Sequence, residues 1–84
     1  MKTKLVCIRD IKVGAYGQPV NVPSIGAAIR SFEDACKPGA ETDVSKHPTD
    51  FELYHLGDYD DQTGNIEVNE KPIFLTKGET HVQK

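Results

Sequence analysis

The sequence predicts a two-layer α+β domain in which one helix packs on a small antiparallel sheet, in the order β-β-α-β-β. Only the segment 25–37 has the apolar spacing of a helix. The segments on either side are rich in β-forming residues and are separated by glycine and proline. With 84 residues the chain has room for one hydrophobic core. We expect one domain over residues 1–76 and a frayed tail over residues 77–84.

The N-terminal third predicts a central strand followed by an edge segment. Residues 4–9 alternate apolar groups on both faces, which favours an interior strand, and residues 11–13 could continue it past a bulge. Residues 14–17 contain two glycines and predict a turn. Residues 18–23 are expected at a sheet edge, because Pro19 and Pro23 have no N–H to donate to a neighbouring strand.

The helix is predicted by its cap, its apolar stripe and its stop signal. Ser24 is placed to accept a hydrogen bond from an early backbone N–H. Pro38 and Gly39 end the helix. Apolar residues follow the spacing of one helix face: Ile25, Ala28, Ile29, Phe32, Ala35 and Cys36.

The C-terminal half predicts a loop, a strand and a hairpin. Residues 38–50 are polar and irregular, with a mobile loop expected over residues 40–44 and a turn at residues 47–50, and residues 51–56 alternate as a strand. Residues 58–68 predict a hairpin in which an aspartate bonds the turn backbone and Gly64 adopts the left-handed conformation. Residues 71–76 are an added strand or a clamp over the core. One sheet face is left open to solvent, a ligand or a second copy.

The sequence contains no pattern typical of an enzyme, a cofactor site or a metal site. Cys7 and Cys36 are expected to be reduced, buried apolar residues. A calcium loop counted from Asp58 fails, since its sixth and twelfth positions hold Thr63 and Asn69. No apolar stretch approaches the length of a membrane span.

Charge is distributed unevenly along the chain. Residues 1–30 have a net charge of +4, residues 31–70 a net charge of −9, and the whole chain −3. Such a chain can present a basic face to a polyanion and an acidic face to water or a protein; alternatively, both faces are merely solvated.

If the basic face binds a polyanion, nucleic acid is the candidate ligand. It needs cations for phosphates and exposed aromatic rings for base stacking. Tyr54 could equally be a half-buried sheet residue, and Tyr16 a ring that caps the turn. The candidate residues are Lys4, Arg9, Lys12 and Arg30 for phosphate contact, and Tyr16 and Tyr54 for stacking.

Four segments in order resemble the small nonstructural protein of gokushovirus-type microviruses, phages with circular single-stranded DNA genomes. The segments are IRD at 8–10, GAAIRSF at 26–32, HPTDFELYHLG at 47–57 and YDDQTG at 59–64. The resemblance implies a non-enzymatic, DNA-associated accessory protein. It would act in the host cytoplasm during the shift to single-stranded progeny genomes.

Three hypotheses follow. The first is a single-stranded-DNA-binding module, in which a homodimer would double the basic surface. The second is an adaptor whose acidic surface engages a viral or host replication or packaging protein. The third is a metal-dependent nuclease. The adaptor's acidic residues would be Glu52, Asp58, Asp60 and Asp61.

Overall fold

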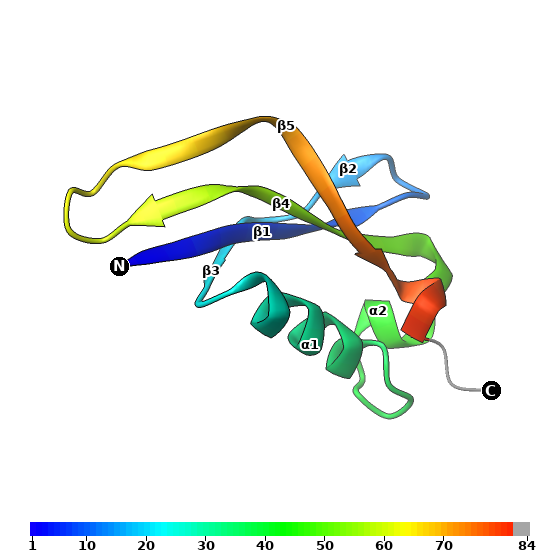
Figure 1. Cartoon of the computed structure of the whole chain (residues 1–84). Helices are drawn as coiled ribbons and strands as arrows, with labels where there is room; N and C mark the ends of the chain where they lie inside the picture. The colour runs from blue at the N-terminus through cyan, green and yellow to red at the C-terminus, as the bar shows by residue number, and fades with distance from the viewer. Residues whose placement is uncertain (82–84) are drawn as a thin grey trace.

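A curled antiparallel sheet with helices on one face forms the fold in a computed structural model that describes residues 1–81 (Figure 1). Its strands run in the order β2-β1-β4-β5, and β3 also pairs with β1. The α+β class and the helix packed on an antiparallel sheet are confirmed, and the structure adds one short strand before that helix and a second, four-residue helix after it. The elements are β1 (Lys2–Asp10), β2 (Ala15–Tyr16), β3 (Val20–Val22), α1 (Ile25–Ala35), α2 (Asp43–Lys46), β4 (Phe51–Asp60) and β5 (Ile66–Lys77).

Strand β1 is interior, as its two apolar faces predict. It pairs with β4 along its whole length, while β2 and β3 share its other side. Residues 11–13 do not continue the strand. The Asp10 carboxylate accepts hydrogen bonds from the N–H groups of Lys12 and Val13, and this closes a turn toward β2.

Helix α1 begins where its cap predicts. The Ser24 hydroxyl accepts from the Ala27 N–H at 3.1 Å. The helix ends at Ala35, short of the predicted residue 37, because the final turn tightens and the Lys37 N–H bonds the Asp34 carbonyl. Its apolar stripe packs on the inner sheet face, where the core consists of Val6, Ala28, Phe32, Cys36, Val44 and Leu53.

The prediction of irregular structure over residues 38–50 is wrong at residues 43–46, which are helical, whereas the turn expected at residues 47–50 is present. The helical residues form α2, and Val44 is buried in the core. A reciprocal capping box between Thr42 and Ser45 stabilises this short helix. A 3-10 turn, η1 (Pro48–Asp50), then leads directly into β4.

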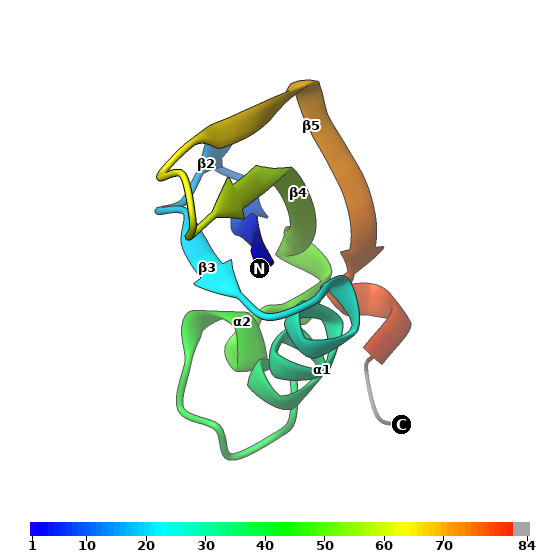
Figure 2. The ribbon, with the colours of Figure 1, turned by 60° about the vertical axis from the view of Figure 1, so that its left-hand side comes forward.

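The predicted hairpin joins β4 to β5. The Asp60 carboxylate accepts from the Gln62 N–H, and Gly64 adopts a φ of 76°. The predicted segment 71–76 belongs to one long strand, β5. The pairing has two irregularities, and at the second the register passes from His55↔Ile73 to Gly57↔Val68. Strand β5 therefore bows away from β4 over residues 69–72 (Figure 2).

The C-terminal segment differs from the expected frayed tail. Residues Gly78–His81 form a second 3-10 turn, η2, which contacts η1. Gly78 is buried so tightly that an added Cβ would collide with the Pro48 carbonyl. The rest of the predicted tail, residues 82–84, lies outside the described residues.

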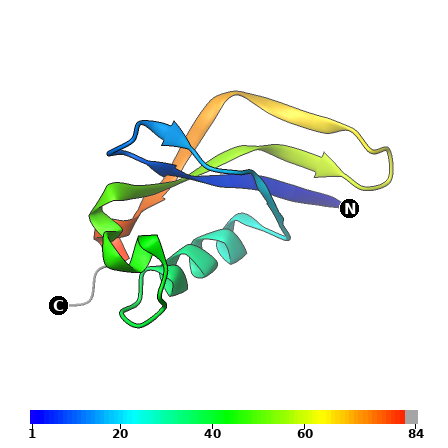
Figure 3. The same ribbon diagram turned by 180° about the vertical axis from the view of Figure 1, so that it is seen from behind.

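The two faces of the sheet have different neighbours. Helices α1 and α2 lie below the sheet in Figures 1 and 3, and no helix covers its upper face. Strand alternation turns Val6 and Ile8 toward α1 and turns Leu5, Cys7 and Arg9 to the opposite, outer face. The prediction of one uncovered sheet face is confirmed for the described residues.

Gly57 lies where the β5 backbone leaves no room for a side chain on β4, and we expect Gly57→Ala to destabilise the fold. The added Cβ would collide with the Glu67 carbonyl and lie 3.1 Å from the Val68 Cα, both backbone atoms of β5. Overpacking of this kind costs about 1–3 kcal/mol. The measurement is the free energy of unfolding in urea.

Gly26→Ala is the matched control. Its added Cβ would come no closer than 3.9 Å to the nearest atom, the Ser24 hydroxyl. Since alanine favours the helix over glycine by up to about 1 kcal/mol, this variant should be at least as stable as the parent chain. Equal stability of the two variants would contradict the close approach at Gly57.

Candidate nucleic-acid interface

Three aromatic rings and one arginine meet on the outer face of the sheet. The Tyr16 and Tyr54 ring centroids are 5.4 Å apart, and the Tyr54 and Phe74 centroids are 5.9 Å apart, both pairs edge to face. The Arg9 guanidinium carbon lies 5.4 Å from the Tyr16 ring centroid. We call this group of four residues the aromatic platform.

The strand register builds the platform. Residues directly opposite each other in paired strands point to the same face of a sheet. Arg9 of β1 is opposite Tyr16 of β2, and Tyr54 of β4 is opposite Phe74 of β5. Cys7 lies opposite Tyr54 on β1 and is buried. The rings therefore come from three strands that are far apart in the sequence.

The platform is open to solvent at its two ends. Tyr16 is 48% exposed and Phe74 is 44% exposed, whereas Tyr54 between them is half-buried. The contacts of Tyr54 with both neighbours hold the row together. Exposed rings on a sheet offer surfaces on which bases or other planar groups can stack.

Glu52 sets the electrostatics of the platform. The Tyr54 hydroxyl donates to a Glu52 carboxylate oxygen at 2.9 Å, and the same oxygen is 4.0 Å from the Arg9 Nη1. Burial raises the pKa of Tyr54, and the hydrogen bond to Glu52 raises it further. The Arg9 Nε is buried and has no hydrogen-bond partner among the described residues. Because the Nε is enclosed, only the partly exposed end of the Arg9 side chain, which is 33% accessible, can meet an acceptor outside the chain.

Two lysines lie at the margin of the platform. Lys12 is exposed in the turn that follows β1, three residues beyond Arg9. Lys77 of β5 is paired with Glu52 in the sheet register, and its ammonium group is 3.5 Å from Glu79. The platform therefore has cations beside it, but carboxylates balance part of their charge.

A separate polar network lies on the inner face, near the hairpin end of the sheet. Lys4 and His55 both bind the Asp58 carboxylate, at 3.1 and 3.0 Å. The Asn69 amide donates to the His55 Nδ1 at 3.1 Å, which assigns the ring proton to Nε2, facing Asp58. The Lys4 and His55 hydrogen bonds lower the pKa of Asp58. This network ties β1, β4 and β5 together.

The predicted binding residues separate into three groups. Arg9, Tyr16 and Tyr54 meet in the platform, and Lys12 lies at its margin. Lys4 lies on the opposite sheet face, bound to Asp58. Arg30 is exposed on α1, which covers that same inner face, so it does not join the platform.

Sequence reasoning missed Phe74, the third ring of the platform. The apolar residues 73–75 are typical of a buried segment, and Leu75, the neighbour of Phe74, does pack against the core as a partly buried residue. The β-bulge between Leu53 and Tyr54 reverses the alternation there and turns Phe74 outward, opposite Tyr54. No local sequence signal locates that bulge.

The expected separation of early cations from later carboxylates is wrong. Strand β1 carries most of the early cations and pairs with β4, which carries acids, so opposite charges meet along the sheet. Two ion pairs join β1 to β4, Lys4–Asp58 at 3.1 Å and Arg9–Glu52 at 4.0 Å, and a third, Lys2–Glu67 at 3.2 Å, reaches from β1 to β5. No continuous basic face forms on these strands.

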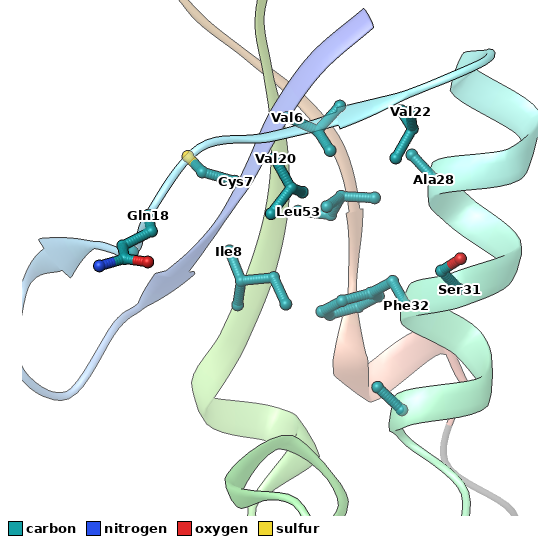
Figure 4. Close-up of a pocket in the computed structure, with 12 residues that line it drawn as sticks. Val6, Cys7, Ile8, Gln18, Val20, Val22, Ala28, Ser31, Phe32 and Leu53 are labelled. Carbon is teal, nitrogen blue, oxygen red and sulfur yellow. The ribbon is translucent and has the colours of Figure 1, made fainter.

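An apolar cavity of about 270 Å³ lies between α1 and the β1–β3 side of the sheet (Figure 4). Phe32 and Ala28 point from the helix toward Val6 and Leu53 across it. Its lining contains no charged side chain. Cys7, Gln18 and Ser31 are the polar residues of an otherwise apolar lining, so we assign the cavity to the core packing.

Residues 1–81 contain neither a cluster of metal ligands nor a membrane-spanning helix. No cluster of three potential metal-ligating side chains occurs there. None of the helices described is long and apolar enough to cross a membrane. Cys7 and Cys36 are both buried and free, as expected.

The chain belongs to the family described as Phage ORF5 protein, whose family model matches residues 3–81. The match covers both the platform and the polar network. Neither the curated proteins nor the solved structures contain a match to this chain.

We expect Asp58→Asn to remove a pH-dependent part of the stability. Because the folded-state pKa of Asp58 is lowered, its carboxylate stabilises the fold above the unfolded-state pKa, near 3.8, and this contribution is lost as pH falls through the folded-state value. The variant should lose about 1 kcal/mol at neutral pH, the usual net value of a lost hydrogen bond. The measurement is urea unfolding at several pH values between neutrality and acid.

Asp34→Asn is the control, because Asp34 forms an exposed ion pair with Lys37 on α1 at 3.1 Å. Exposed pairs contribute little, so this variant should follow the parent chain at every pH. If Asp58→Asn shows the same acid dependence as the parent chain, the polar network does not stabilise the fold as argued.

Proposed function

We propose, taking membership of this phage family as the premise, that the outer sheet face binds single-stranded DNA. The protein would be a non-enzymatic accessory factor in single-stranded genome replication, in a microvirus of the gokushovirus type and in the host cytoplasm. The observation that carries the proposal is the aromatic platform, a row of three rings with Arg9 beside it.

Stacking supplies the first part of the argument. Aromatic side chains on an open sheet bind unpaired bases through their flat surfaces, at about 1–3 kcal/mol per base. Tyr16 and Phe74 are the exposed rings, and Tyr54 lies between them and holds their spacing. The platform thus has two places where a base can stack.

The small number of cations favours single strands over duplex DNA. In a duplex the bases are already stacked on one another, so binding rests on phosphate and groove contacts. Of the cations beside the rings, Lys77 is paired with Glu79 and Arg9 is partly balanced by Glu52, so Arg9 and Lys12 are the two counted for phosphate contact. Two phosphate contacts on a single strand give a slope of log K against log salt of about −1.4, which is shallow.

The adaptor hypothesis receives less support, because its acidic residues are engaged within the chain. Glu52 accepts from Tyr54, Asp58 binds Lys4 and His55, and Asp61 pairs with the N-terminal amine at 2.9 Å. A basic partner would have to displace these contacts. We therefore place single-stranded DNA first and keep the adaptor as the rival outcome.

The test is fluorescence anisotropy with a labelled single strand and a duplex of the same length, at about 50 mM salt, where phosphate contacts are strong. We expect the single strand to bind more tightly. Phe74→Leu and Tyr16→Leu should each weaken binding about 5- to 150-fold, the equivalent of one lost stacking contact. Phe74→Tyr and Tyr16→Phe retain a ring and should bind like the parent chain.

Arg9→Ala and Arg30→Ala form the matched pair for charge. Only Arg9 lies at the platform, so only Arg9→Ala should weaken binding and flatten the salt slope. Absence of binding to either DNA, or equal losses for the two arginine variants, would overturn the proposal. Retention of a replication or packaging protein without DNA would favour the adaptor, and cleavage of the DNA with Mg²⁺ or Mn²⁺ would favour the nuclease.

A further inference from the structure

The two edges of the sheet differ in length and protection. One edge is divided between β2 and β3, of two and three residues, and Pro19 and Pro23 flank β3. The other edge is β5, which is twelve residues long and has one proline, Pro72, near its middle. Within residues 1–81 its one strand neighbour is β4. A long open edge presents unpaired backbone N–H and C=O groups to which another strand can add.

Exposed apolar side chains gather on the same strand. Nine large hydrophobic residues are exposed within the described part of the chain, and four of them belong to β5: Ile66, Val68, Ile73 and Phe74. Where β5 bows from β4, a hollow of about 410 Å³ opens between the strands, with Leu5, Leu56 and Pro72 in its wall. The register turns Val68 to the outer face, opposite Gly57, and Ile73 to the inner face, opposite His55, so the exposed apolar groups border the β5 edge on both faces. Apolar groups concentrated along one edge mark an interaction site.

The distribution of charge along β5 indicates what kind of partner could bind at this edge. The two glutamates, Glu67 and Glu70, lie in the first half of the strand, and the two lysines, Lys71 and Lys77, lie in the second half. Glu67 and Lys77 are already paired within the chain, with Lys2 and Glu79, which leaves Glu70 and Lys71 at the middle of the strand for a partner. When two such strands pair antiparallel about that point, Glu70 of each lies near Lys71 of the other. The strand has no net charge, so a polyanion gains little there.

We propose that a second copy of this chain binds antiparallel along β5, which gives a two-fold symmetric dimer with one continuous sheet. A two-fold axis limits the assembly to two chains, because each β5 edge pairs with the β5 edge of the other chain. The opposite edge of each sheet is short and flanked by proline, so it offers no site for a further chain. The outer faces of both copies would then lie on the same side, with Phe74 of each chain next to the seam. This inference does not depend on DNA binding.

Sedimentation velocity on the full chain tests the dimer. At about 100 µM, well above a micromolar Kd, we expect a species of twice the chain mass of 9.3 kDa. The double variant Val68→Lys, Ile73→Lys should sediment as a monomer, because it places two charges on the apolar surface of each strand. A monomeric parent chain at this concentration would overturn the inference.

Val13→Lys is the matched control. Val13 is 73% exposed and Val68 is 77% exposed, but Val13 lies in the turn between β1 and β2. The control should remain dimeric. If it dissociates as fully as the double variant, the contact does not involve β5. Far-ultraviolet circular dichroism establishes that each variant is folded.

A cysteine substitution tests the antiparallel arrangement. Lys71 lies near the middle of β5, close to the expected two-fold axis, so Lys71→Cys should form an interchain disulfide under mild oxidation. The native Cys7 and Cys36 are 1% and 3% exposed and do not compete. Val13→Cys should not cross-link; equal cross-linking of both would contradict the arrangement. A monomeric protein that still binds single-stranded DNA would overturn this inference alone.

Discussion

The antiparallel pairing of β1 with β4 is the interaction on which the rest of the structure depends. It places Cys7 opposite Tyr54, Arg9 opposite Glu52 and Lys4 opposite Asp58. The same register therefore buries the centre of the sheet, anchors one side of the platform and neutralises cations of the N-terminal segment. The two strands lie more than forty residues apart in the chain. Their pairing brings the basic N-terminal segment next to acidic residues, so the separation of charges along the sequence is lost on the surface.

The two faces of this sheet differ in what covers them. The inner face carries nearly the whole hydrophobic core, with Phe32 of α1 packed on Val6 and Leu53. Beyond the reach of α1, the inner face is closed by the His55–Asp58–Lys4 network, in which each polar group has a partner. The outer face has no helix to cover it, and its aromatic rings cover one another only in part.

Local sequence signals predicted the elements that depend on neighbouring residues. Ser24 capped α1, Gly64 closed the hairpin, and the alternation in residues 4–9 marked an interior strand. Alternation also carried information that the sequence reasoning did not use: Lys4 and Arg9 are five residues apart on one strand, so they point to opposite faces. Helix α2 was missed because its stability comes from Val44 reaching the core as well as from its cap.

The sequence by itself determined the α+β class, the position of α1 and the hairpin, because caps, turns and periodicity act over a few residues. It also marked Arg9, Tyr16 and Tyr54 as candidate binding residues, but strand register brings them together. Only the tertiary structure decided which cations keep free charge, that Phe74 joins the rings, and that β5 is left as the open edge. Those features arise from strand register and from a β-bulge. Register is the outcome of long-range pairing, in which a shift of one residue exchanges the two faces of a strand.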